Sequence, residues 1–155
     1  MTMATISIPR HIKGERVWNA LMQARPGGLS TSELATVCDL SQSQVRAGLT
    51  EIREERAQAE RTPLTWSRRT GHQLSEHPEV WREFELSVVH SILTRVIRLL
   101  KATVVPHSEL VPDDTKIAKV IAQLNAAVAS LEMITDMSTT EPKPTRRRRK
   151  AEVRS

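Results

Sequence analysis

The 155-residue sequence predicts a mainly α-helical protein with one small β-hairpin, followed by a C-terminal α-helical hairpin. Three observations predict this fold class. Apolar residues recur every three or four positions through most of the chain, which is the period of an amphipathic helix. Two capping-box patterns, at residues 30–33 and 41–44, mark two helix starts close together. Residues 63–75 change to a period of two around Gly71, which is typical of a β-hairpin.

The chain is predicted to begin with an N-terminal arm and one helix. Residues 1–11 are interpreted as an arm, because they lack a periodic pattern and Pro9 disfavours a helix. The first helix is predicted from Gly14 to Arg25, where Val17, Trp18, Leu21 and Met22 have helical spacing. The sequence Pro26-Gly27-Gly28 then ends the pattern.

Two helices joined by a tight turn are predicted next. A short helix follows Ser30, a turn lies at residues 38–40, and a longer helix follows Ser41. In the longer helix the apolar residues Val45, Leu49 and Ile52 share one face, which we expect to be buried. Asp39 occupies the turn, and Asp tolerates the left-handed conformation better than most residues do.

Residues 76–137 predict a helical hairpin. Its first helix begins at Pro78 and reaches about Val104 before Pro106 ends it, and its second runs from roughly Asp113 to Met137. The apolar surface is wider than a single partner helix needs, which predicts a homodimer. The expected dimer interface comprises Val89, Leu93, Val96, Ile97, Leu100, Leu124 and Leu131. The alternative is that the hairpin packs on the N-terminal domain as additional core.

Charge is distributed unevenly along the chain. The net charge is +3 over residues 1–75, −4 over 76–141 and +6 over 142–155, which gives +5 in total. Residues 138–155 are therefore interpreted as a disordered basic tail. Its basic block is expected to make non-specific phosphate contacts, although a merely solubilising end fits the composition equally well. The block consists of Arg146, Arg147, Arg148, Arg149 and Lys150.

Several classes of protein are excluded by composition. A single cysteine, Cys38, cannot form an internal disulfide. The sequence has neither a secretory signal pattern nor an uninterrupted apolar run of membrane-spanning length. We therefore expect a cytoplasmic, nucleoid-associated protein without membrane contact. The five histidines are dispersed, and no nucleophile or phosphate-loop motif occurs. We therefore expect no catalytic residues, no metal and no cofactor.

The order of these elements resembles a known family. Residues LSTSELATVCDLSQSQVRAGLTEI followed by LTWSRRTGHQL are similar to the winged helix-turn-helix DNA-binding regulators, of the small type found on phages and mobile elements and of the antibiotic-resistance repressor type. The resemblance covers residues 12–75. It implies that the longer helix enters the major groove of double-stranded DNA and that the hairpin forms the wing.

The candidate DNA-binding residues lie opposite the buried face of the longer helix and in the hairpin turn. They are Gln42, Ser43, Arg46, Ala47, Thr50 and Arg53, together with Arg68 and Arg69. Gln and Arg can make bidentate hydrogen bonds to adenine and guanine, and the small Ala and Thr side chains permit close approach. Arg68 and Arg69 are expected to reach phosphate or a narrow minor groove. A solvated polar helix surface is the simpler reading of the same residues.

The sequence therefore predicts a dimeric, sequence-specific transcriptional regulator, most simply a repressor that recognises a palindromic site. Two alternatives remain open at this point. One is a DNA-binding accessory protein for the replication, partition or recombination of a mobile element. The other is a winged-helix module that binds another protein instead of DNA.

Overall fold

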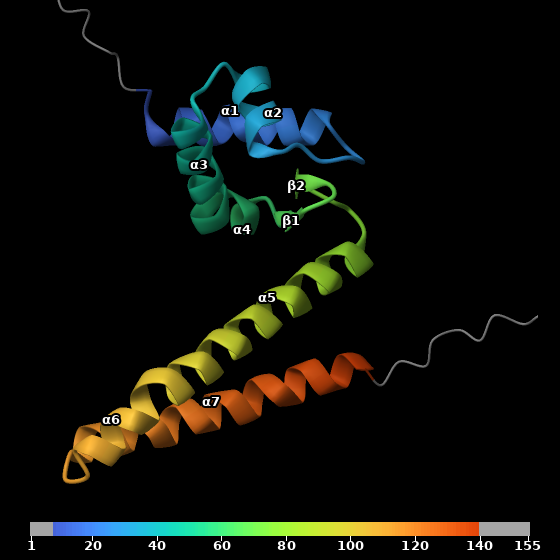
Figure 1. Cartoon of the computed structure of the whole chain (residues 1–155). Helices are drawn as coiled ribbons and strands as arrows, with labels where there is room; N and C mark the ends of the chain where they lie inside the picture. Colours follow the sequence, from blue (N-terminus) through green and yellow to red (C-terminus); the bar gives the residue numbers. More distant parts are fainter. Residues whose placement is uncertain (1–7, 140–155) are drawn as a thin grey trace, which may run out of the picture. The chain divides into compact units, whose positions relative to one another are not determined.

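A computed structural model of the chain describes residues 8–139, and these form two compact units that meet between Glu85 and Leu86 (Figure 1). The described residues are mainly helical with one two-stranded antiparallel sheet, as predicted. The first unit extends beyond the predicted boundary at residue 75, because the indole Nε1 of Trp81 donates a hydrogen bond to the Ser75 carbonyl at 2.8 Å. The tail block at residues 146–150 lies outside the described residues.

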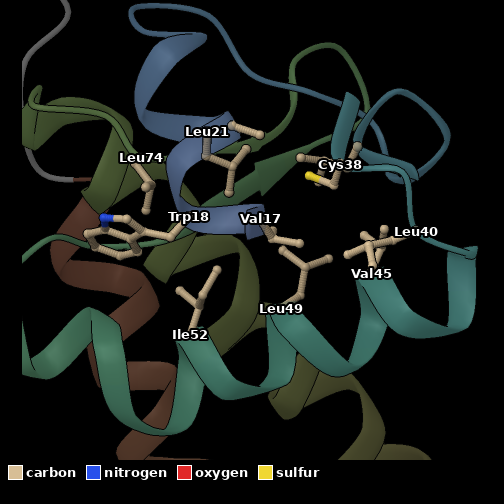
Figure 2. Close-up of a cluster of buried hydrophobic side chains, with 11 residues drawn as sticks. Val17, Trp18, Leu21, Cys38, Leu40, Val45, Leu49, Ile52 and Leu74 are labelled. Atoms are coloured by element: carbon tan, nitrogen blue, oxygen red, sulfur yellow. The ribbon is translucent and has the colours of Figure 1, made fainter. Parts of the chain in front are cut away.

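The first unit is built on three helices and their shared core. These are α1 (Arg10–Gln23), α2 (Thr31–Cys38) and α3 (Gln42–Glu51), and α3 continues through the π-helical turn η1 (Ile52–Arg56) into α4 (Ala57–Ala59). Their buried side chains converge between α1 and α3 (Figure 2). The largest fully buried residues are Val17, Leu21, Leu34, Val45, Leu49, Ile52 and Leu74. The predicted inner face of α3 is therefore confirmed.

Both predicted capping boxes are present. At α2 the Ser30 hydroxyl accepts from the Glu33 N–H while the Glu33 carboxylate accepts from the Ser30 N–H, and at α3 Ser41 and Gln44 make the same exchange. Each box satisfies backbone N–H groups that the first turn of a helix leaves unpaired. The two boxes fix where α2 and α3 begin.

The turn between α2 and α3 depends on Asp39. This residue has φ 52° and ψ 53°, which is the left-handed conformation that its short polar side chain was predicted to tolerate. The preceding Cys38 is buried and lies 3.5 Å from the Arg16 carbonyl. The turn thus anchors the end of α2 on α1 and directs the chain into α3.

The start of α1 differs from the prediction. The helix begins at Arg10, two residues inside the segment interpreted as an arm, and it ends at Gln23 instead of Arg25. Pro9 precedes the helix with φ −57° and ψ 150°, and its carbonyl accepts from the Lys13 N–H at 3.2 Å. A proline at this place sacrifices no hydrogen bond, so it opens the helix that it was expected to prevent.

The predicted β-hairpin forms between β1 (Thr65–Ser67) and β2 (Gly71–Gln73). Gly71 has φ +72°, a conformation that glycine adopts without steric cost, and it ends the turn between the two strands. Leu29 adds an isolated antiparallel bridge to His72 on the other side of β2. The bridge ties the segment before α2 to the hairpin, so both are held against the same core.

The second unit contains most of a long helical hairpin. Helix α5 (Pro78–Leu99) begins in the first unit and continues through the π-helical turn η2 (Leu100–Val104) into α6 (Val105–Leu110), and α7 (Thr115–Thr139) returns (Figure 1). The prediction that Pro106 ends the first helix is wrong. The π-helical turn precedes Pro106, which occupies the first turn of α6, where its missing N–H removes no regular helical bond. Asp114 caps α7, since its Oδ1 accepts from the Lys116 and Ile117 N–H groups.

Helix α7 is unusually apolar. Its segment Thr115–Met137 is long and apolar enough, by length and composition alone, to cross a membrane, with a mean hydropathy of 1.4. The segment contains no uninterrupted apolar run of membrane-spanning length, because its alanines, leucines and isoleucines are interspersed with polar residues, so the expectation that no membrane contact occurs did not take it into account. None of the segment is buried within the described chain. This exposed surface requires an explanation of its own.

Candidate nucleic-acid interface

Helix α3 presents a polar surface opposite its buried face. Gln42, Ser43 and Arg46 are exposed, whereas Val45 and Leu49 on the other side are 0% and 2% exposed. The first two turns of the helix therefore have one side fixed in the core and one side open. Side chains on the open side project from a backbone that cannot rotate without disrupting the core.

Local hydrogen bonds at the start of α3 divide its polar residues into two groups. The Gln44 amide is held by the capping box, with its oxygen 2.9 Å from the Ser41 N–H. The Ser43 and Ser41 hydroxyls lie 3.1 Å apart, so Ser43 is oriented by the same cap. Gln42 and Arg46 take no part in the cap and remain the longest outward side chains of this turn.

The later part of the candidate surface is more restricted than the sequence suggested. Ala47 and Thr50 are half-buried, and the Thr50 hydroxyl donates to the Arg46 carbonyl at 2.9 Å. Thr50 therefore retains only acceptor capacity for a further partner. Arg53 is exposed but belongs to η1, after the regular part of α3 ends.

Two of the three acidic residues beside Arg53 pair with arginines of the fold, whereas Glu55 is exposed. Glu51 points inward with 6% exposure, and its carboxylate is 4.0 Å from Arg56, while Glu54 pairs with Arg10. No local sequence pattern predicts that Glu51 and Glu54 face α1 instead of the open surface. Paired carboxylates repel an anion bound at α3 less strongly than the same number of unpaired carboxylates would.

Arg68 and Arg69 are both exposed in the turn of the hairpin. Ser67 and Thr70 stiffen this turn, because their hydroxyls lie 2.7 Å apart and Ser67 Oγ accepts from the Thr70 N–H at 3.0 Å. An open groove of about 510 Å³ separates the hairpin turn from the start of α2, and its lining includes both arginines, Ser30 and Thr31. The groove combines two cations with the positive end of a helix dipole, opposed by Glu33.

The four candidate arginines share one electrostatic property. Within residues 8–137, whose side chains the structure describes, Arg46, Arg53, Arg68 and Arg69 have no ion-pair partner. The other arginines of this region that do have one are Arg10, Arg25 and Arg56, paired with Glu54, Glu76 and Glu51. Arg16, Arg61, Arg82, Arg95 and Arg98 of the same region also have no ion-pair partner, so what distinguishes the four candidates is their place on α3, η1 and the hairpin turn.

Two residues of the site were missed by the sequence analysis. Trp66 is 47% exposed on β1, directly opposite His72 on β2, and it lines the groove beside Arg68. His72 is buried, although the sequence shows it only as one of five dispersed histidines. A three-residue strand shows too little alternation to reveal which side chain faces outward, so no sequence signal distinguished the two.

The environment of His72 links the hairpin to α3. Burial, and to a smaller extent the nearby positive charge of Arg53, lowers the pKa of His72 to about 4. Its Nε2 lies 3.4 Å from the Thr31 hydroxyl, and its Nδ1 is buried without a hydrogen-bond partner in the described residues. The imidazole is therefore neutral at physiological pH.

The described residues contain no group of three His, Cys, Asp or Glu side chains that could hold a metal ion. Burial raises the pKa of the Cys38 thiol, so this cysteine is protonated and a poor nucleophile. The chemistry that the site offers is instead hydrogen bonding and attraction of anions by arginine.

Comparisons of the chain with known protein families, with curated proteins and with solved structures found no match.

Proposed function

We propose that this protein is a winged helix-turn-helix, sequence-specific double-stranded DNA-binding regulator that acts as a dimer and represses transcription. Helix α3 would lie in the major groove, and the hairpin of β1 and β2 would act as the wing. The observation that carries the proposal is the exposed polar face of α3, with unpaired Arg46 on a helix whose other face is fully buried.

The connection between α2 and α3 supports this role for α3. A recognition helix must be held at a steep angle to the preceding helix, so that it alone enters a groove about 12 Å wide. The left-handed Asp39 and the two capping boxes produce an abrupt change of direction between α2 and α3. The order of a first helix, a bridging segment at Leu29, α2, α3 and a hairpin is the order of the winged helix-turn-helix family.

The roles of the individual side chains follow from their accessibility. Arg46 is assigned to the strongest base contact, because its guanidinium is exposed and can bind guanine O6 and N7 in a bidentate manner. Gln42 is assigned to specificity beside it. Arg53, Arg68 and Arg69 are assigned to phosphate or minor-groove contacts, because they lie beyond the regular part of α3 or in the hairpin.

Selection of bound fragments from a random duplex library tests the proposal. We expect a palindromic consensus, because paired recognition helices of a two-fold dimer read two half-sites about one helical turn apart. Absence of any enriched sequence would contradict sequence-specific recognition. A site at a replication origin or recombination sequence, instead of a promoter, would favour the accessory-protein alternative.

The Arg46→Ala variant tests the reading face. It should lose about 1–3 kcal/mol at one base pair and relax the choice of base there. Arg82→Ala provides a matched control, because Arg82 is an exposed arginine outside the proposed interface. Unchanged affinity of Arg46→Ala for the selected site would refute the assignment of this face.

A further inference from the structure

The helical hairpin of the second unit buries very few side chains. Among its described residues only Leu93, Leu100 and Val104 are buried, and α7 contributes none of them. Several large apolar side chains of the hairpin are exposed within one chain, among them Ile92, Leu99 and Val120. An exposed apolar surface of this kind favours contact with a further surface.

Buried and half-buried residues follow one seam along each helix. On α7 the seam consists of half-buried residues at alternating intervals of four and three, namely Ile117, Ile121, Leu124, Val128, Leu131 and Thr135. On α5 and η2 the inward residues are buried or half-buried, namely Leu86, Val89, Leu93, Ile97, Leu100 and Val104. The expected dimer residues Leu93 and Leu100 are thus already covered within one chain, and the other five are half-buried.

Most residues one position before the inward ones are apolar and form a second set, which Thr103, Lys116, Gln123 and Ser130 interrupt. On α5 it comprises Val88, Ile92 and Leu99, which are 39%, 44% and 46% exposed. On α7 it comprises Val120, Ala127 and Ile134, of which Val120 and Ile134 are 42% and 39% exposed. One residue corresponds to a rotation of 100° about a helix axis, and because the two helices are antiparallel the same offset brings both sets to one side of the hairpin. We call these six residues the apolar face.

The opposite side of the hairpin is polar. Residues one position after the inward ones include His90, Thr94 and Lys101 on the first arm and Asn125, Glu132 and Asp136 on α7. A groove of about 370 Å³ on this side is lined by Lys101, Asn125 and Glu132 together with the apolar Ile97, Leu100, Val105 and Val128. This side therefore carries more charged residues than the first, although Met133 and Met137 are also exposed on α7.

We propose that the apolar face is covered by the same face of a second copy of this chain, which forms a four-helix assembly. All six residues of the face are uncharged, so two copies can meet there without burying an unpaired charge. Residues 86–139 contain five Lys or Arg and five Asp or Glu, so no net charge opposes association of two copies. Pairing one surface with itself is the geometry of a two-fold dimer.

A membrane is the other surface that could cover apolar side chains, and the charges of α7 argue against it. A span over Thr115–Met137 would place Lys119, Asn125 and Glu132 in or near the hydrocarbon, where each polar group is costly. Helices that lie along a membrane surface have a strongly basic polar flank, whereas this hairpin has acidic and basic residues there. A second copy leaves all of these groups in water.

This inference deepens the dimer that the proposed function requires, but its test uses no DNA, so the two can fail separately. Ile134→Asp introduces one charge on the apolar face, and Asn125→Asp introduces the same charge on the polar side of the same helix. Sedimentation equilibrium of the full chain at micromolar concentration should show a dimer for the wild type and for Asn125→Asp. Ile134→Asp should weaken dimerisation by about 100-fold or more.

A cross-linking pair keeps the test decisive if Ile134→Asp unfolds. Ala127 lies on the apolar face and Ala129 on the other side of α7, so Ala127→Cys should be joined to its copy by a bis-maleimide much faster than Ala129→Cys. The natural Cys38 is buried and should react little. A monomeric wild type, equal dimerisation of both aspartate variants, or equal cross-linking of both cysteine variants would overturn the proposal. Flotation of a monomeric wild type with neutral phosphatidylcholine vesicles would assign the face to a membrane instead.

Discussion

Gly48 of α3 lies directly against the backbone of Lys13 in α1, where an added Cβ atom would stand 2.8 Å from the Lys13 carbonyl oxygen. The same Cβ would be 3.1 Å from Cγ2 of Val17, in the core. This close approach sets the separation of α1 and α3, and so it determines how far the candidate surface of α3 stands out from the unit.

We therefore expect Gly48→Ala to destabilise the first unit by about 1–3 kcal/mol, although alanine favours helices more than glycine does. Urea unfolding followed by circular dichroism measures the change. Gly27→Ala is the control, because its Cβ would meet only the Ala24 carbonyl oxygen, at 3.2 Å. Equal stability of the Gly48 variant and the wild type would mean that the two helices can separate freely.

The buried His72 predicts that stability depends on pH. Its pKa in the folded protein is lowered to about 4, chiefly by burial and then by Arg53, from an ordinary value of 6.5. The unfolded chain therefore binds the proton more readily, and the stabilisation is fully present above pH 6.5 and is lost as the pH falls toward 4. Urea titrations between pH 7.5 and 4.5 should show this loss.

The His72→Gln variant should flatten the pH dependence in that window, whatever its effect on absolute stability. His11→Gln is the matched control, because His11 is exposed at the start of α1. A pH dependence that persists unchanged in His72→Gln would assign the titration to another group.

The turn at Asp39 provides a third prediction. Its left-handed conformation costs an ordinary residue about 1–2 kcal/mol, so Asp39→Ala should lower the free energy of unfolding by about 1 kcal/mol. Asp39→Asn should leave it nearly unchanged, since Asn also adopts this conformation readily. Thermal unfolding compares the two, and an equal loss in both variants would point to the Asp39 carboxylate instead of the backbone.

These elements also indicate what a sequence can reveal. The starts of α2 and α3, the left-handed Asp39 and the inner face of α3 were predictable, because capping and helical period are local signals. The burial of His72 and the inward turn of Glu51 were not, because both depend on which distant segment lies against them. The prediction that Pro106 ends the helix failed for a local reason, because a π-helical turn before a proline leaves no recognisable sequence pattern.

The same distinction applies to the second unit. The periodic apolar residues predicted two helices and too much apolar surface for a lone hairpin. Neighbouring residues of a helix differ by a rotation of 100° about its axis, so one of them can face the partner helix while the other is exposed. Because both positions hold apolar side chains here, the sequence does not show which of the two faces inward. Exposure in the folded chain separates Leu93 and Leu100 from Ile92 and Leu99.

The salt dependence of DNA binding tests the hairpin arginines. If Arg68 and Arg69 contact phosphates, each releases about one counterion on binding, so replacing both with alanine should reduce the slope of log affinity against log salt concentration by about 2. The affinity should fall by a similar factor for selected and random duplexes, because phosphate contacts carry no base information. Arg82→Ala should change neither quantity. The contrary outcome is a double variant that loses its preference for the selected site and keeps the same salt slope. That result would mean that these arginines read bases, because a base contact links affinity to sequence without displacing counterions.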